Sequence, residues 1–378
     1  MKIVFVGLGG IPYSSRAIDV RLGSFAELFV NCGYEVEIIN RYSPNKVNVQ
    51  TPYTINEAFP KMAPKSKMAR LVLYALALIC EPFRIFNSNR KKKIDVLFMS
   101  TGHFVDIVIY RLISWIIGTK LVDQYCEARS SFETKGIYAR INGFLVDKIS
   151  PKLWDGSVCI SHYLQESCVK VNKNLPTSIV YPLCDFTLFD GCDYTNNSDY
   201  ILFCGSIGYR ETIDFILESY RKSKMHETVK LLMILAGSKS NLEAFKRENE
   251  DVAVESNLPY ADLIKRYKGA RALLIPLRNI TRDIARFPNK TCEYCASKGV
   301  IVTTNVGEMP YVFKDGLNAV VADCYDSDEY AEKLDWIFDN TDKTESIRAH
   351  CYETGLKHFS LEAYQGAMSD FFNILTKR

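Results

Sequence analysis

Phe287-Pro-Asn-Lys-Thr-Cys-Glu-Tyr-Cys-Ala-Ser-Lys-Gly-Val-Ile-Val-Thr-Thr304 is the stretch that decides the fold. Pro288 is typical of a first helical turn, and Gly299 is typical of a C-terminal cap. The run at 300–304 is β-branched and apolar, as in a buried strand. The stretch therefore predicts one short helix followed by a strand, and similar alternation elsewhere in the chain indicates an α/β fold with parallel sheets.

Lys290 and Glu293 lie on one face of this predicted helix, near its start. Unpaired N–H groups and the positive end of the helix dipole favour a phosphate there, and an ammonium adds a point charge. Glu293, one turn further on, can accept hydrogen bonds from two ribose hydroxyls. The pair predicts a nucleoside diphosphate site; the alternative is an ordinary amphipathic helix with a capping proline.

The pattern Pro-x-Lys-x-x-Glu-Tyr-x-Ala resembles the donor-site segment of family 4 glycosyltransferases, which transfer sugars from nucleotide-sugar donors. The resemblance implies an α/β fold of the GT-B type, with two Rossmann-like domains whose parallel sheets face a central cleft. It makes Glu293 the second glutamate of the Glu-x7-Glu motif of the family. Ala285 stands where the first glutamate belongs, and Asp283 is the nearest acidic substitute.

The chain opens with a Rossmann-like pattern, which is a strand at 1–7, a helix near 16–32 and a strand at 33–39. A dinucleotide fingerprint would need a glycine at Pro12, so NAD binding is not expected. The resemblance implies that the loop of Gly9 and Gly10 faces the cleft, where glycines let the backbone approach substrate. The alternative interpretation is that these glycines only form a tight turn.

A second Rossmann-like pattern begins at residue 200, where a strand leads through Gly205 and Ser206 to a helix near 212–222. Such a turn can present backbone N–H groups to an anion. Arg210 is expected to contact the diphosphate, and the alternative is a solvated arginine at a helix start. Ser206 replaces the arginine usual in the family, so Arg282 or Arg286 is expected to supply a further cation.

Gly307 and Glu308, in the loop after the strand at 300–304, complete the donor site that the resemblance implies. Cations and N–H donors there would stabilise the charge that develops on the departing diphosphate of a UDP or GDP sugar. The chain shows no Asp-x-Asp of the kind that holds a divalent ion and no clustered histidine ligands among its five histidines, so neither a metal nor another cofactor is expected. The resemblance also implies retention of the anomeric configuration.

Glu127 and His103 are the candidates on the acceptor side. Glu127 ends a predicted strand at a place where many relatives have a histidine, and it could orient or deprotonate the acceptor hydroxyl. The alternative is a carboxylate that starts a helix near Ser130. His103 follows another strand, and it is the second candidate for this role.

Length and composition agree with two domains of ordinary size in 378 residues. We expect an N-terminal acceptor-side domain at 1–185, a donor-binding domain at 186–355, and a C-terminal helix at 356–378 that crosses back to the N-terminal domain. No apolar run reaches the length of a spanning helix, and no signal peptide precedes the first strand. Twelve cysteines without a disulfide framework favour a reducing cytoplasm.

Residues 1–185 carry a net charge of +8, against +3 for the whole chain. Nine basic residues and only one acid, Glu81, lie between Lys61 and Lys93, and they flank the apolar run at 71–80. This pattern predicts peripheral binding to the cytoplasmic face of the membrane, with a saccharide or a polyprenyl- or lipid-linked acceptor. The alternative is a core helix with solvated basic ends. Nucleic acid is not expected, because no stacking aromatics are interleaved with the basic residues.

The sequence thus predicts a metal-independent glycosyltransferase of polysaccharide or glycolipid synthesis. Two other functions remain open. A nucleotide-sugar 2-epimerase of the same fold would also bind a nucleoside diphosphate. A degenerate relative, without the first glutamate and the loop arginine, would only bind nucleotide or would only support a partner transferase.

Overall fold

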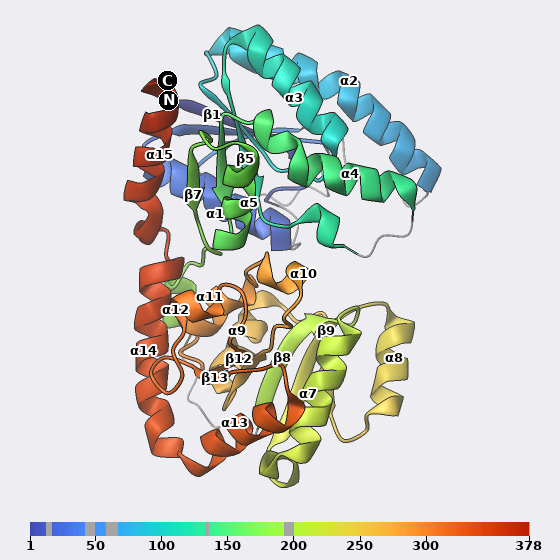
Figure 1. Cartoon of the computed structure of the whole chain (residues 1–378), viewed down its shortest axis with the longest axis vertical. Coiled ribbons are helices and arrows are strands. Elements are labelled where there is room, and N and C mark those ends of the chain that lie inside the picture. The colour runs from blue at the N-terminus through green and yellow to red at the C-terminus, as the bar shows by residue number, and fades with distance from the viewer. Residues whose placement is uncertain (13–16, 42–49, 58–66, 133–135, 193–199, 378) are drawn as a thin grey trace. The chain divides into compact units, whose positions relative to one another are not determined.

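The computed structural model describes residues 1–12, 17–41, 50–57, 67–132, 136–192 and 200–377. These residues form two compact units (Figure 1). The first contains Met1–Leu183 together with Leu361–Arg378, and the second contains Cys184–Ser360. Each unit has a parallel sheet and its own core, so each is described by itself.

The sheet of the first unit has the strand order β3-β2-β1-β4-β5-β6-β7, and all its pairings are parallel. The order reverses between β1 and β4, as in a Rossmann fold. Its strands are β1 Lys2–Leu8, β2 Glu35–Asn40, β3 Thr54–Glu57, β4 Val96–Met99, β5 Lys120–Tyr125, β6 Gly156–Cys159 and β7 Thr177–Ile179. Its helices are α1 Ala17–Asn31, α2 Lys67–Lys91, α3 Phe104–Ile117, α4 Ile137–Lys148, α5 His162–Val171 and α15 Gln365–Lys377.

Aromatic side chains fill the core of this unit on the α1 side of the sheet. Phe5 of β1 and Phe98 of β4 pack against Phe25 and Phe29 of α1. Phe372 of α15 meets Phe29 edge to face, with 5.0 Å between the ring centroids. These rings are fully buried or nearly so, and such pairs add to the free energy gained by burial. The C-terminal helix is therefore part of the core of the first unit.

The sheet of the second unit repeats this topology, with the parallel order β10-β9-β8-β11-β12-β13 and a reversal between β8 and β11. Its strands are β8 Tyr200–Ser206, β9 Lys230–Ala236, β10 Ala253–Glu255, β11 Leu273–Ile275, β12 Ile301–Thr304 and β13 Val320–Ala322. Its helices are α6 Thr187–Asp190, α7 Arg210–Lys222, α8 Lys239–Glu248, α9 Tyr260–Gly269, α10 Thr281–Ile284, α11 Lys290–Ala296, α12 Met309–Val312, α13 Ser327–Asp339 and α14 Thr341–Phe359. The two sheets confirm the expected α/β class with two Rossmann-like units.

The helix in the deciding stretch, α11, differs from its prediction at both ends. Pro288 precedes the N-cap residue Asn289, and the left-handed residue after the helix is Lys298, with φ of 56°, instead of Gly299. Gly299 is required for a different reason. A Cβ at this position would lie 2.1 Å from Cδ1 of Leu273, so the glycine allows the turn after α11 to pack against β11.

Across the described ranges, no helix combines the length and the apolar character that a membrane crossing requires. This includes α2, the longest helix, although its outer side is rich in hydrophobic residues.

Candidate functional site

The predicted donor residues of the second unit gather where the loops after β8, β11 and β12 leave the sheet. β8 and β11 are neighbours at the point where the strand order reverses. In open α/β sheets, ligands bind outside the carboxyl ends of the strands at such a point. The topology therefore places Ser206, Arg286, Lys290 and Gly307 on segments that border a typical ligand position.

Lys290 is the first residue of α11, as the sequence predicts. It is partly buried, and no described carboxylate lies within 4.0 Å of its ammonium group. Burial raises the pKa of the Cys204 thiol on β8, and the Lys290 charge opposes this shift, so the ammonium lies near β8. Because α11 has only seven residues, its dipole is small, and the ammonium itself is the main positive charge here.

Glu293 lies one turn after Lys290, and its carboxylate is held by Tyr260, the first residue of α9. The Tyr260 hydroxyl donates a hydrogen bond to Oε1 of Glu293 over 3.1 Å. Burial raises the pKa of Glu293, while Lys290, Tyr260 and the buried Tyr267 oppose the rise. The carboxylate is thus fixed in position beside a cation, and its remaining lone pairs can accept hydrogen bonds from hydroxyl groups.

Replacement of Tyr260 by phenylalanine is expected to weaken nucleoside diphosphate binding by about 3- to 10-fold, the effect of one hydrogen bond that positions Glu293. Isothermal titration calorimetry measures the change. Tyr352→Phe is the matched control, because it removes a similar hydrogen bond to Asp190 in the same unit. Equal affinities of wild type and Tyr260→Phe would show that Tyr260 does not position the site.

Two guanidinium groups stack on Tyr209, the residue before α7. Those of Arg286 and Arg282 lie 5.1 and 5.4 Å from the centroid of its ring. Arg286 also donates a hydrogen bond to the Tyr209 hydroxyl over 3.2 Å. Tyr209 caps α7 without a side-chain hydrogen bond. Both predicted accessory cations therefore lie beside the start of α7, where an anion would be favoured.

Asp283 holds this arrangement together from inside the unit. Its carboxylate is 1% exposed and pairs with Nε of Arg278 at 2.8 Å and with Nη2 of Arg286 at 2.7 Å. Each carboxylate oxygen lies within ion-pair distance of a guanidinium, so the buried Asp283 positions two arginines, and its burial argues against a role as a substitute for the missing glutamate. Ala285, at the place of that glutamate, is 1% exposed.

The change Asp283→Asn is expected to lower the free energy of unfolding by about 3 kcal/mol, because two partly buried guanidinium groups lose their common counter-ion. Urea unfolding of the purified protein measures this loss. Asp214→Asn, at an exposed aspartate of α7, is the control and should change the stability little. A variant Asp283→Asn as stable as wild type would refute the proposed structural role.

The loop after β8 does not present its N–H groups as the sequence predicts. Ile207 N–H donates to the Ala236 carbonyl, Tyr209 N–H donates to the Ser206 carbonyl, and Gly208 N–H donates to Oγ of Ser206. Gly205 is required by packing, since a Cβ there would lie 2.7 Å from the Phe203 ring. Helix α7 begins at Arg210, two residues earlier than predicted. Because the N–H groups of residues 207–209 already have acceptors, only the N–H groups in the first turn of α7 remain for an anion.

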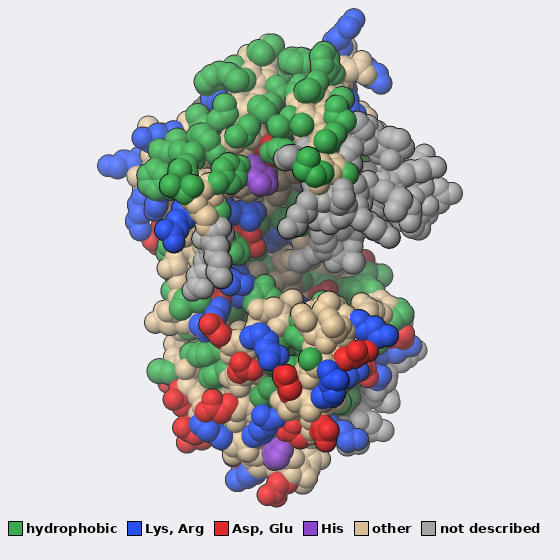
Figure 2. Space-filling model, turned by 90° about the vertical axis from the view of Figure 1, so that its right-hand side faces the viewer, with side chains coloured by type: hydrophobic (Ala, Val, Ile, Leu, Met, Phe, Trp, Pro, Cys, Tyr) green, Lys and Arg blue, Asp and Glu red, His purple; other side chains and the backbone are tan. Residues whose placement is uncertain are grey.

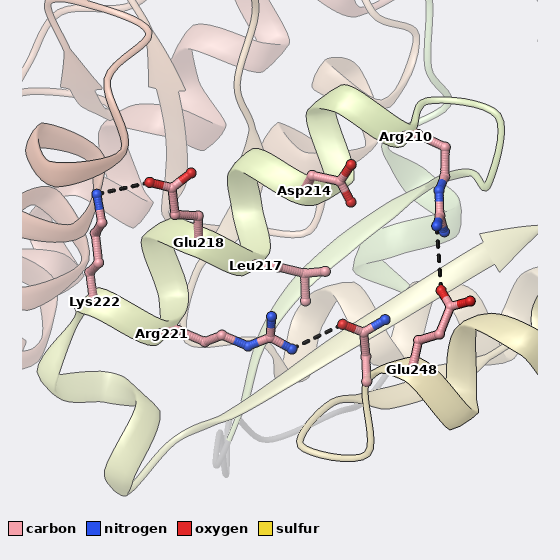
Figure 3. A pocket seen from close by; sticks show the side chains of 8 residues that line it. Arg210, Asp214, Leu217, Glu218, Arg221, Lys222 and Glu248 are labelled. Carbon is pink, nitrogen blue, oxygen red and sulfur yellow. Dashed lines mark hydrogen bonds and ion pairs between the residues drawn. The ribbon is translucent and has the colours of Figure 1, made fainter.

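Arg210, the predicted diphosphate contact, is directed to α8 in this structure. Its Nη2 lies 3.4 Å from Oε2 of Glu248, and its guanidinium lies 5.7 Å from the Phe245 ring centroid. Arg210 lies at one end of a surface hollow (Figure 3), whose volume is about 420 Å³. Nη2 of Arg221, which also lines this hollow, donates a hydrogen bond to Oδ1 of Asn249. A contact of Arg210 with a diphosphate remains a prediction, and it requires Arg210 to exchange Glu248 for the ligand.

Gly307 and Glu308 lie between β12 and α12. Gly307 has φ of 62°, and a Cβ there would lie 3.1 Å from Cα of Ile284, so only glycine fits this close approach to α10. Glu308 is 2% exposed. The loop is thereby fixed against the segment that carries Asp283.

The loop of Gly9 and Gly10 in the first unit is fixed by Asn40 at the end of β2. Oδ1 of Asn40 accepts hydrogen bonds from the N–H groups of Gly10 and Ile11, and its Nδ2 donates to the Ile11 carbonyl. Gly10 has φ of 104°, which favours glycine. The tight turn is therefore observed, while contact of Gly9 and Gly10 with a substrate remains a prediction.

The loops after β4 and β5 bring the two acceptor-side candidates into one region of the first unit. Glu127 forms an ion pair with Arg129 at 3.1 Å, and the Arg129 guanidinium packs on Gly102, next to His103. His103 is the exposed N-cap residue of α3, with its ring centroid 5.8 Å from that of Tyr74. Glu127 precedes the short helix Arg129–Ser131 and is not part of it.

A buried charged cluster near β1 and β4 of the first unit was not predicted from the sequence. Arg41 lies between the carboxylates of Glu81 and Asp106, at 2.8 Å from each, and donates to the Tyr110 hydroxyl at 2.6 Å. Burial opposes the charge, but Tyr110, Glu81 and Asp106 raise the pKa of Arg41 above its ordinary value. The available signal was Glu81 itself, a single acid in an apolar helix, which requires a buried partner.

In the ranges that the structure describes, no group of three or more His, Cys, Asp or Glu side chains is arranged to hold a metal ion.

Comparisons with known proteins bear on the family and the fold of the chain. Residues 194–355 match the model of the family described as glycosyl transferases group 1. No curated protein sequence matches the chain. Similar solved structures include sucrose-phosphate synthase from Thermosynechococcus elongatus, with 13% identity over 100% of this chain and 99% of that one, and a TM-score of 0.74.

Two further solved structures are similar to the chain over almost its whole length. Anabaena Alr3699/HepE in complex with UDP and glucose has 13% identity over 99% of this chain and 100% of that one, with a TM-score of 0.68. The lipopolysaccharide outer core galactosyltransferase WaaB has 12% identity over the whole of both chains, with a TM-score of 0.62. At these identities the likeness shows the fold, which is GT-B.

Proposed function

Because residues 194–355 match the family model of glycosyl transferases group 1 and the chain has the GT-B fold, we propose that the protein moves a sugar from a nucleoside diphosphate sugar to an acceptor hydroxyl. Family and fold together support sugar transfer. The identity of the donor, the identity of the acceptor and the stereochemistry of the transfer are parts of what we propose.

The observation that carries the proposal is the arrangement of Lys290 and Glu293. A partly buried ammonium without a carboxylate partner among the described residues lies one helical turn from a carboxylate held by Tyr260. Lys290 would contact the diphosphate, and Glu293 would accept the ribose hydroxyls. The leaving group gains negative charge as the sugar–phosphate bond breaks, so a preorganised cation lowers the barrier.

We propose that the reaction needs no metal and retains the anomeric configuration. Lys290 and the guanidinium groups beside Tyr209 would supply the positive charge. On the acceptor side, Glu127 would orient or deprotonate the hydroxyl while Arg129 holds its carboxylate, and His103 is the second candidate. The structure of HepE with UDP and glucose makes a UDP sugar the first donor to test, before a GDP sugar.

For the acceptor we propose a saccharide or a lipid-linked saccharide in the assembly of a cell-surface polysaccharide or glycolipid. The fold shared with WaaB agrees with such a role. The basic, apolar surface of the first unit favours a peripheral location on the cytoplasmic face of the membrane.

Thermal-shift screening against nucleoside diphosphates and their sugar conjugates tests the donor site. A ligand that binds only the folded state raises the melting temperature. We expect one diphosphate series, with UDP as the first candidate, to stabilise the wild type and not Glu293→Ala. Absence of any shift would favour a degenerate relative, and consumption of the sugar nucleotide without an acceptor, with epimerised product, would favour a 2-epimerase.

A further inference from the structure

The outer sides of three neighbouring helices in the first unit carry exposed hydrophobic side chains. α2 contacts α3, and α3 contacts α4. Figure 2 shows hydrophobic side chains gathered over this side of the first unit, with lysine and arginine at its margins. Isolated exposed hydrophobic residues are ordinary on protein surfaces, but a patch that extends over three helices indicates an interaction site.

On α2 the exposed residues form one stripe along the helix. Met68, Val72, Leu76, Ile79 and Phe83 follow one another at intervals of three or four residues, and each is exposed, Phe83 at 70%. Residues with this spacing lie on one side of a helix. The helix ends with the exposed residues Arg90 and Lys91, so its apolar stripe leads to a basic end.

α3 extends the same surface. Its exposed residues Leu112, Trp115 and Ile116 lie in the last two turns. The guanidinium of Arg111 lies 4.9 Å from the centroid of the Trp115 ring, while its Nη1 pairs with Asp155 at 2.6 Å. A tryptophan that is 61% exposed and stacked under a cation has both the apolar and the polar character found at membrane interfaces.

α4 has a similar stripe. Ile137, Ile141 and Phe144 are exposed at helical spacing, and Lys148 is the next residue of this stripe and the last of the helix. Tyr138 is also exposed, beside Ile137.

The acidic residues of these helices all lie inside the unit. α2, α3 and α4 each have one acid, and these are Glu81, Asp106 and Asp147, with exposures of 1%, 0% and 4%. Glu81 and Asp106 pair with Arg41, and Asp147 accepts a hydrogen bond from the Tyr125 hydroxyl. The exposed charged side chains described on the three helices are therefore basic.

We infer that the outer face of α2, α3 and α4 docks on an anionic lipid bilayer, with its hydrophobic side chains in the headgroup region. This inference rests on the proposed peripheral location and names the surface and the lipid class. Apolar stripes with Lys or Arg at their ends match a surface that is negative outside and apolar beneath. A protein partner would more often be matched by charges of both signs, such as those of the second unit (Figure 2).

Sedimentation with vesicles of phosphatidylcholine alone, and of phosphatidylcholine mixed with phosphatidylglycerol, tests this inference on the full chain. We expect binding to the mixed vesicles that weakens with salt. The double variant Trp115→Ser, Phe144→Ser should partition about 10- to 100-fold more weakly, since two large side chains no longer enter the lipid. The matched control Leu188→Ser, Ile374→Ser removes two exposed hydrophobic residues elsewhere and should bind like wild type.

Tryptophan fluorescence provides a second readout that a change of fold would not mimic. Of the three tryptophans, Trp154 is 3% exposed and Trp336 packs against the core of the second unit, so only Trp115 is placed to enter lipid. Mixed vesicles should shift its emission to the blue, and Trp115→Phe should still bind without the shift.

Three outcomes would overturn the inference. These are equal vesicle binding by the face variant and wild type, equal binding to both kinds of vesicle, and self-association through this face without vesicle binding. The nucleotide thermal shift of the face variant is measured in parallel and should be unchanged. If the wild type binds vesicles but no nucleotide, the donor proposal alone is refuted. If the wild type binds nucleotide but no vesicles, the docking proposal alone is refuted.

Discussion

Replacement of Lys290 by alanine is expected to lower kcat/KM for sugar transfer by about 10²- to 10³-fold, the range seen when one preorganised donor to a developing negative charge is removed. Lys290 is the partly buried cation at the start of α11, near β8. Its charge should matter more in the transition state than in the bound donor, because the diphosphate gains charge only as the bond breaks. Most of the loss should therefore appear in kcat.

Steady-state kinetics with the donor found in the thermal-shift screen measures this effect. Lys239→Ala is the matched control, since Lys239 is also the first residue of a helix of the second unit but is exposed at its surface. The control should keep the activity of wild type. If Lys290→Ala transferred sugar at the wild-type rate with its fold intact, the proposed contact with the leaving group would be wrong. If wild type itself had no activity with any donor, the degenerate-relative hypothesis would gain support.

The parts of this site that could be predicted are those set by local spacing. Lys290 and Glu293 lie in one short helix, so their relation follows from a period of 3.6 residues and a single turn of chain. The alternation of strands and helices similarly predicted both sheets, because buried parallel strands are continuous apolar runs. The observed C-terminal end of α11 differs from the prediction because Lys298, which has a Cβ, adopts the left-handed conformation in place of Gly299.

The parts that could not be predicted depend on contacts between distant segments. Tyr260 reaches Glu293 from 33 residues away, and nothing in the sequence around Tyr260 indicates this hydrogen bond. Arg210 has Glu248 as a neighbour only because α7 and α8 cover adjacent strands, and a sequence pattern assigns no such partner. Asp283 was considered for the sugar contact because of its position near Ala285, but its burial between two arginines is a property of the folded unit.

The apolar surface of the first unit was predicted in part. The sequence showed the basic and apolar pattern of α2, but the alternative of a core helix remained open. The structure describes exposed hydrophobic side chains on α2 and also on α3 and α4, whose sequences alone are those of ordinary helices covering a sheet. Whether the side chains of α2, α3 and α4 are exposed depends on whether another element packs on the outside of these helices, and sequence periodicity cannot supply this information.

The change Glu293→Gln is expected to weaken nucleoside diphosphate binding by about 10- to 100-fold, because hydrogen bonds to a charged acceptor contribute more than those to a neutral one. The glutamine keeps the size of the side chain, so the effect reports the charge and the acceptor capacity. Removal of the ribose 2′-hydroxyl from the ligand should weaken binding to wild type but should have little further effect in Glu293→Gln. This non-additivity, measured by calorimetry, identifies the ribose as the partner. Additive losses would place Glu293 away from the ribose.

The pH dependence of binding gives an independent test of the same carboxylate. Burial raises the pKa of Glu293 above its ordinary value, so the ionised acceptor is lost as pH falls through that raised pKa. The nucleotide affinity of wild type should therefore decrease on acidification. The affinity of Glu293→Gln should not show the part of this decrease that comes from protonation of Glu293. The effect on stability has the opposite sign. In the ligand-free protein the folded state holds this proton more tightly than the unfolded state does, so the contribution of Glu293 to the free energy of unfolding falls as pH rises. Ligand affinity that falls on acidification while the stability of the empty fold does not would separate a binding role of Glu293 from a purely structural one.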